Sequence, residues 1–283
     1  MALTSFIPKL WSAELLVSLK STLIYGQDGV INRDYEGEIK QYGDTLQINK
    51  INGVTISDYT RDQDMTAAEA LGGVGTTLTI DQSKAFNFQI DDLDKAQMNP
   101  KVMEQAMEEA AYALRNAADT FVATKIYLGV KEGNTIGTDL VPVVLTKDTI
   151  YDTIVDLGTI LDENDVPEVG RKVILPPWAV GMLEKSPHFT PASKLGDDVK
   201  QNGFIGKVSD FLVLKSNNVP NTAGTLYKIV AVHPMATTYA EQVNEIEGYR
   251  PEKRFADAVK GLHLYGTKVT RPEAVAVLTA NKA

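Results

Sequence analysis

The sequence predicts an α+β protein in which a long helix and an extended β-ribbon are attached to a compact body. The first observation is an uninterrupted helical pattern at residues 100–128. The second is a β-rich stretch at residues 36–90 with a polar, glycine-rich segment in its middle. The third is the alternation of helix and strand patterns from residue 146 onward, which is typical of an α/β layer.

The long helix has clear start and stop signals. Asn99 is a favoured N-cap residue, Pro100 is tolerated at the first helical position, and Gly129 favours a stop. No glycine or proline lies between them, so we expect a helix about 40 Å long. Its apolar face is predicted from residues spaced three and four apart: Met103, Ala106, Met107, Ala110, Leu114, Ala117 and Phe121. The polar side chains are expected largely on other faces: Glu104, Glu108, Glu109, Asn116 and Asp119.

The composition is that of an acidic chain without cysteine. The 283 residues carry a formal net charge of −9, which argues against a general nucleic-acid reader with a basic surface. This length permits one large domain or two moderate ones. Without cysteine there is no disulfide and no thiolate metal site. We expect no signal peptide, because residues 1–8 lack a basic region followed by an apolar one. We also expect no membrane span, because no apolar run of about 18 residues occurs.

The N-terminal part of the chain is predicted to be an arm that contains a helix reaching about residue 25. A helical pattern follows Pro8, and its large apolar side chains recur on one face: Leu10, Trp11, Leu15, Leu19 and Leu23. Such a face needs a cover, which is either the chain's own core or another subunit.

The next region is predicted to be a long two-stranded ribbon. Strand patterns at residues 44–51, 54–59 and 76–90 surround a polar tip. A lone ribbon is marginal in water, so it lies either on a neighbouring copy or, as an ordinary hairpin, on the chain's own sheet. If it lies on a neighbour, the expected contact residues are Tyr59, Arg61, Asp62 and Asp64 at the tip and Leu10, Trp11 and Leu15 in the arm.

The body is predicted to begin with a helix at residues 146–161, whose buried side consists of Ile150, Ile154, Leu157 and Leu161. A second, short helix is expected at residues 178–184. Strands are predicted at residues 172–175, 211–214, 227–232, 237–243, 262–269 and 274–278.

No group of residues predicts catalysis. The three histidines, His188, His233 and His263, have no partner at metal-ligand spacing, and no G-x-S-x-G nucleophile motif occurs. The acidic run Asp91-Asp92-Leu93-Asp94 lacks the glycine and terminal glutamate of a calcium loop. We therefore expect no enzymatic activity, no cofactor and no metal.

The order of these elements resembles the major capsid protein of tailed bacteriophages, with the Hong Kong 97-type fold. The resemblance covers essentially the whole chain and depends on short segments at Ile7–Ser12, Asn32–Ile39, Gly43–Thr45, Leu78–Gln82, Ser216–Pro220 and Lys260–Gly266. Each segment is weak by itself, but their order and spacing together are specific.

The resemblance implies a division into four parts. These are an N-terminal arm (1–34), an extended loop or β-ribbon (35–90), a peripheral domain with the spine helix (91–138 plus 237–283) and an axial domain (139–236). It also implies hexamers and pentamers that form an icosahedral shell in the virion, assembled in the host cytoplasm. The implied partners are other copies, a portal, scaffolding or decoration proteins, and packaged double-stranded DNA bound without sequence specificity. No membrane partner is implied.

Two alternatives remain open at this point. An encapsulin-like compartment with enzyme cargo would use the same fold, and its shells would contain protein rather than nuclease-protected DNA. An acidic α/β hydrolase is a more distant alternative, for which no nucleophile and base can be named.

Overall fold

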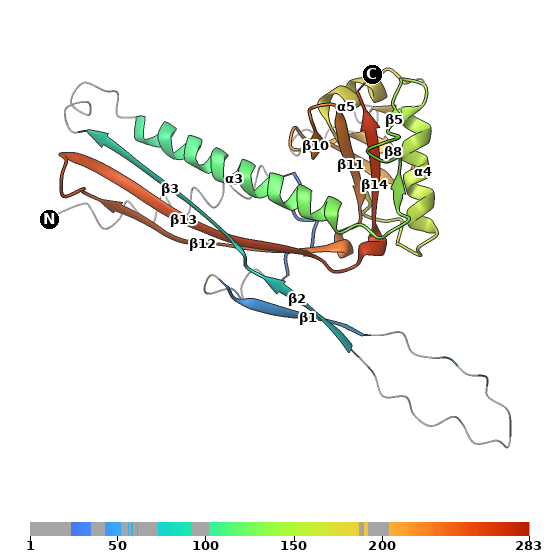
Figure 1. The fold of residues 1–283 in the computed structure, drawn as a ribbon, viewed down its shortest axis with the longest axis horizontal. Helices are drawn as coiled ribbons and strands as arrows, with labels where there is room; N and C mark the ends of the chain where they lie inside the picture. The colour runs from blue at the N-terminus through green and yellow to red at the C-terminus, as the bar shows by residue number, and fades with distance from the viewer. Residues whose placement is uncertain are drawn as a thin grey trace.

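A computed structural model describes residues 24–34, 43–51, 56, 58, 61, 73–91, 102–186, 190–191 and 204–282. Figure 1 shows an elongated molecule in which a long helix and a sheet of long strands lie at one end and a compact body lies at the other. A two-stranded ribbon leaves the molecule near the junction of these two parts.

The long helix α3 (Val102–Leu128) lies along an antiparallel sheet of three strands. The sheet contains β12 (Thr237–Tyr249), β13 (Ala256–Val269) and β3 (Gln82–Asp91), in that order. The described helix agrees with the pattern predicted at residues 100–128. The contact between helix and sheet buries Ala111, Leu114, Ile246 and Val259, with Met107, Phe86 and Phe88 packed around them.

The buried face of α3 is wider than predicted and is rotated. Ala118 and Val122 are fully buried, whereas the predicted positions Ala110 and Ala117 are only half-buried. Asp119, which we expected on an outer face, is also buried, so that expectation was wrong. The cause is that the first half of α3 packs on the three-stranded sheet and its second half joins the core of the body.

The body contains a mixed sheet of nine strands in the described part of the chain. Its main path is β4 (Thr135–Ile136), β14 (Val275–Asn281), β11 (Leu226–Val232), β6 (Lys172–Leu175), β9 (Phe211–Lys215), β8 (Phe204–Val208) and β7 (Thr190–Pro191). Two short strands lie off this path: β10 (Asn221–Thr222) pairs with β11, and β5 (Val143–Val144) pairs with β14. The central strands β11 and β14 are mainly apolar, and most of their residues are buried, as expected for strands that are covered on both faces.

Helices α4 (Ile150–Asp162) and α5 (Pro177–Glu184) belong to the body. The predicted buried side of α4, from Ile150 to Leu161, is confirmed. The helix begins four residues later than predicted, because Thr146 and Thr149 form a local turn in which each hydroxyl accepts a hydrogen bond from the other's backbone N–H.

The body and the three-stranded sheet are joined by two neighbouring connections. Each is a short 3₁₀ turn, η5 (Pro234–Ala236) between β11 and β12 and η6 (Pro272–Ala274) between β13 and β14. The Thr270 backbone N–H donates to the Ala236 carbonyl at 2.8 Å, so the two connections are hydrogen-bonded to each other. The chain thus crosses between the two parts twice at the same place.

The β-rich run that we expected at residues 76–90 is divided into two strands. It consists of β2 (Gly73–Thr79) and β3, with a break at Ile80 and Asp81. Only β2 pairs with β1 (Thr45–Ile51) in the ribbon, whereas β3 pairs with β13. The described ribbon is therefore shorter than the predicted one, and β3 supports α3 instead.

Candidate assembly interface

Strands β1 and β2 form a ribbon that is separate from both other sheets. Their antiparallel register runs from Thr45 opposite Thr79 to Ile51 opposite Gly73. Among the described residues, neither strand pairs with a third strand. Figure 1 shows the ribbon pointing away from α3 and from the body. Strands β1 and β2 therefore belong to neither of the other sheets, whereas β3 is a strand of the three-stranded sheet.

The ribbon is attached through a small apolar root on the β12–β13 hairpin. Leu78 and Ile80 are fully buried against Ala240 and Leu264, and Leu46 and Ile48 pack around this cluster. The Gly43 N–H donates to the Ile80 carbonyl, and the Ile80 N–H donates to the Asp44 carbonyl, both at 3.1 Å. The root is thus ordered, but its core contains only a few side chains.

Most of the predicted contact residues lie outside the described part of the chain. This applies to Leu10, Trp11 and Leu15 in the arm and to Tyr59, Asp62 and Asp64 in the ribbon. Arg61 is described and exposed, as are Ile56 and Asp58. The contact role of all seven predicted residues stays a prediction.

The end of the arm is fixed to α3 by a buried carboxylate. Asp119 Oδ1 accepts hydrogen bonds from the backbone N–H groups of Ile24 at 3.1 Å and Tyr25 at 2.7 Å. Asp119 Oδ2 accepts a hydrogen bond from Asn218 Nδ2 at 3.0 Å, which joins the turn before β10 to α3. Burial raises the pKa of Asp119, while the hydrogen bond from Asn218 and those from the backbone oppose this shift. One side chain therefore joins the arm, the long helix and the body.

A second buried network joins the arm to the three-stranded sheet. Asn32 pairs with β12 through two backbone hydrogen bonds of 2.9 Å, one to Thr237 and one from Tyr239. Beside it, Arg33 forms an ion pair with Glu241. The other oxygen of Glu241, Oε2, accepts from the Tyr239 hydroxyl at 2.8 Å and lies 3.2 Å from His263 Nε2.

The charge of Glu241 is stabilised by these partners. Burial by itself raises the pKa of Glu241, but the hydrogen bond to His263 and the charge of Arg33 outweigh it and lower the pKa to about 2. Sequence reasoning missed this network because Arg33 and Glu241 are 208 positions apart and no motif links them. His233, by contrast, directly follows β11, and its Nδ1 accepts a hydrogen bond from the Met235 N–H of η5 at 3.2 Å.

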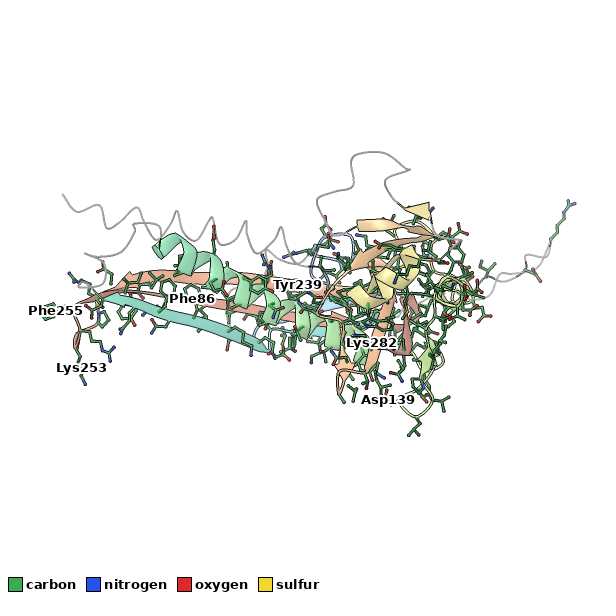
Figure 2. All side chains as sticks on the ribbon, turned by 90° about the horizontal axis from the view of Figure 1, so that it is seen from above. Phe86, Asp139, Tyr239, Lys253, Phe255 and Lys282 are labelled. Carbon is green, nitrogen blue, oxygen red and sulfur yellow. The ribbon has the colours of Figure 1, made fainter. Side chains whose placement is uncertain are left out.

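Apolar side chains are exposed at both ends of the molecule. Figure 2 shows Phe255 at the tip of the β12–β13 hairpin and Asp139 on the body at the other end. Phe255 is 83% exposed, and Leu140, next to Asp139, is 94% exposed. Exposed large apolar side chains are typical of protein contact sites when they gather on one surface.

Other kinds of site have little support in the described residues. No group of three or more histidine or acidic side chains is placed to hold a metal ion there. Within the same residues, no helix is both long and apolar enough to cross a membrane. The features that require an explanation are therefore the ribbon, the anchored arm and the exposed apolar side chains.

An elongated subunit with a long helix on a hairpin sheet, a mixed-sheet body and a projecting ribbon is the Hong Kong 97-type shell fold. Solved structures support this class. The chain is similar to a protein of Mycobacterium phage Che8, with a TM-score of 0.69, 29% identity and 88% of each chain covered. It is also similar to the capsid structure of the cyanophage P-SCSP1u, with a TM-score of 0.67 and 16% identity over 86% of this chain and 85% of the other.

A protein of the holo-SrpI encapsulin complex from Synechococcus elongatus shares the fold as well. The TM-score is 0.54 and the identity 11%, over 85% of this chain and 83% of the other. At this identity the likeness concerns the fold alone. No curated protein sequence matches the chain.

A family model described as phage capsid protein matches residues 73–278, which is more than half of the chain. The chain therefore belongs to the phage capsid protein family, and it is a major capsid protein that assembles with copies of itself into the shell of a virion. The predicted fold class and family resemblance are confirmed.

Proposed function

We propose that copies of this chain form hexamers and pentamers of an icosahedral shell around a double-stranded DNA genome, without catalysis, and that the ribbon and the arm make the contacts between copies. The observation that supports this is the ribbon β1–β2, which pairs with no third strand among the described residues. Isolated two-stranded ribbons are marginal in water, so a neighbouring copy is the natural support.

The finer division of the chain is part of the same proposal. The arm (1–34), the extended loop (35–90), the peripheral domain (91–138 plus 237–283) and the axial domain (139–236) are the units that we propose. Within it, β3 supports the peripheral domain, since it pairs with β13. A portal and scaffolding or decoration proteins are the further partners, and assembly takes place in the host cytoplasm.

The net charge of −9 fits a shell that encloses DNA without holding each phosphate. A basic lining would bind the genome tightly and with a strong dependence on salt. The test is to purify particles from infected cells and to treat them with nuclease. Nuclease-protected double-stranded DNA is expected inside. Shells that contain protein cargo and no DNA would instead support the encapsulin-like alternative, which shares the fold.

Charge reversal at the ribbon tip tests the contact role of the ribbon. We expect Arg61→Glu and Asp62→Lys to leave the subunit folded and to reduce the yield of regular particles, because a repeated contact multiplies a small loss in each interface. Circular dichroism checks the fold, and negative-stain electron microscopy counts the particles. The matched control is Lys147→Glu, a charge reversal at an exposed residue of the body. Normal particles from both ribbon variants would contradict the contact role.

A further inference from the structure

Gly266 lies in β13, opposite Ala240 of β12 and at the root of the ribbon. A Cβ atom at this position would lie 2.5 Å from the Thr79 carbonyl oxygen and 3.1 Å from the Ile80 Cα. Both are backbone atoms, one in the last residue of β2 and one in the segment that joins β2 to β3, so a change of rotamer cannot move them away. The φ of Gly266 is not in the left-handed region, so the backbone conformation does not require a glycine. The glycine is required because a side chain would have no space at this position.

The other two glycines of the β12–β13 hairpin differ from Gly266 in this respect. A Cβ at Gly261 would meet the ring of Phe86, which is a side chain. A Cβ at Gly248 would have its nearest neighbour, the Ala258 carbonyl oxygen, only at 4.0 Å. Of the three, Gly266 alone lets the backbone of the ribbon root lie directly on the hairpin.

The contact occurs at the point where the ribbon changes direction. The β-run breaks at Ile80 and Asp81, between the strand that belongs to the ribbon and the strand that belongs to the sheet. Ile80 is fully buried there, and its backbone carries both hydrogen bonds to the segment before β1. A shift of Ile80 therefore moves both strands of the ribbon together.

We propose that Gly266 is a positioning residue that sets the direction in which the ribbon leaves the subunit, and thereby the geometry of its contact with a second copy. The second part rests on the intersubunit role proposed above for the ribbon. A side chain at this position would displace the root by about 1 Å, since close-packed atoms do not overlap. Strand β2 extends roughly 23 Å away from the root. A small tilt at the root therefore causes a larger displacement at the far end of the strand.

The direction of the ribbon can be measured directly because the chain has no cysteine. Spin labels on Thr77→Cys in β2 and Glu109→Cys in α3, both exposed positions, report one distance in the free subunit by pulsed electron paramagnetic resonance. The doubly labelled chain that retains Gly266 should give one narrow distance distribution. Gly266→Ala should shift its maximum, Gly266→Val should shift it further, and the control Gly248→Ala should leave it unchanged.

The assembly of the same variants is then measured by electron microscopy and light scattering. We expect Gly266→Ala to lower the yield of regular particles about tenfold, a factor that corresponds to about 1.4 kcal/mol in a single equilibrium. Gly248→Ala should assemble normally. Thermal unfolding of each variant shows that the subunit remains folded.

The possible outcomes separate this inference from the proposed function. A broad distance distribution in the labelled chain that retains Gly266, or a maximum that does not move in either Gly266 variant, would overturn the positioning role. The first of these results does not depend on the folding of any variant at Gly266. A shifted distance together with normal particles would leave the positioning role intact and would contradict the intersubunit role of the ribbon.

Discussion

The nine-stranded sheet of the body and the two-stranded ribbon β1–β2 differ in what covers them. The central body strands β11 and β14 are buried almost throughout, by side chains of the same chain. The ribbon has a buried root on one face, while its residues Thr45, Gln47, Thr77 and Thr79 are exposed. The body therefore has the core of an independently stable unit, whereas the ribbon depends on what it touches beyond its root.

The comparison indicates how stability and assembly are divided in this molecule. A change in the body core should lower the free energy of unfolding of the subunit and affect assembly only through folding. A change in the ribbon should have a small effect on that free energy and a direct effect on assembly. The three predictions below test this division, in order of the expected loss in free energy of unfolding.

The largest loss is expected for Leu157→Ala in α4. Leu157 is fully buried in the body core, and leucine-to-alanine changes in such sites cost about 4 kcal/mol through lost burial and the remaining cavity. Chemical denaturation of the unassembled subunit measures the change. The neighbouring control Asp156→Ala, at an exposed position of the same helix, should stay within about 0.5 kcal/mol.

The next prediction concerns the buried network at the junction between arm and sheet. The pKa of Glu241 is lowered from the ordinary glutamate value of 4.5 to about 2 in the folded chain. Its stabilising contribution is therefore present above about pH 4.5 and is lost as the pH falls towards 2, and it amounts to roughly 3 kcal/mol at neutral pH. Glu241→Gln should remove this contribution and flatten the dependence of stability on pH in that window.

The measurement is the free energy of unfolding of the subunit between pH 2 and 7. The control is Glu247→Gln, an exposed glutamate of the same strand that pairs with Lys260 at 2.8 Å. Because both of these side chains are more than half exposed, the control should change stability by less than about 1 kcal/mol. An unchanged pH dependence in Glu241→Gln would show that the network does not stabilise the junction between arm and sheet.

The sequence predicted the elements with strong periodicity and missed those that depend on distant residues. Helix α3 and the buried side of α4 follow from the spacing of apolar residues. Strand β1 follows from the alternation of polar and apolar residues, and strands β6 and β9 follow from short, mainly apolar runs. The division of β2 from β3 was missed because the break at Ile80 and Asp81 contains neither glycine nor proline. The full length of β12 was missed because a register shift between Val243 and Glu245 interrupts the alternation.

The sequence predicted less of the candidate site than of the fold. The role of Asp119 arises from partners that lie about 100 positions away in the chain. Of the partners of Glu241, Tyr239 and His263 lie near it in the sequence, whereas Arg33 lies 208 positions away. Gly266 is one of 21 glycines, and only the crossing of the ribbon root over β13 distinguishes it. Such roles come from tertiary contacts, for which a single sequence carries no periodic signal.

The smallest loss in free energy is expected at the ribbon root, where Ile48→Ala should cost about 1 kcal/mol because Ile48 is only half-buried there. The yield of regular particles should nevertheless fall, since a loosened root no longer holds the ribbon in one direction. Gln47→Ala, on the exposed face of the same strand, is the matched control and should change neither quantity. If Ile48→Ala destabilised the subunit as much as Leu157→Ala, the root would unfold together with the body. The ribbon would then be part of the same cooperative unit, and the division between a stable body and a dependent ribbon would not hold.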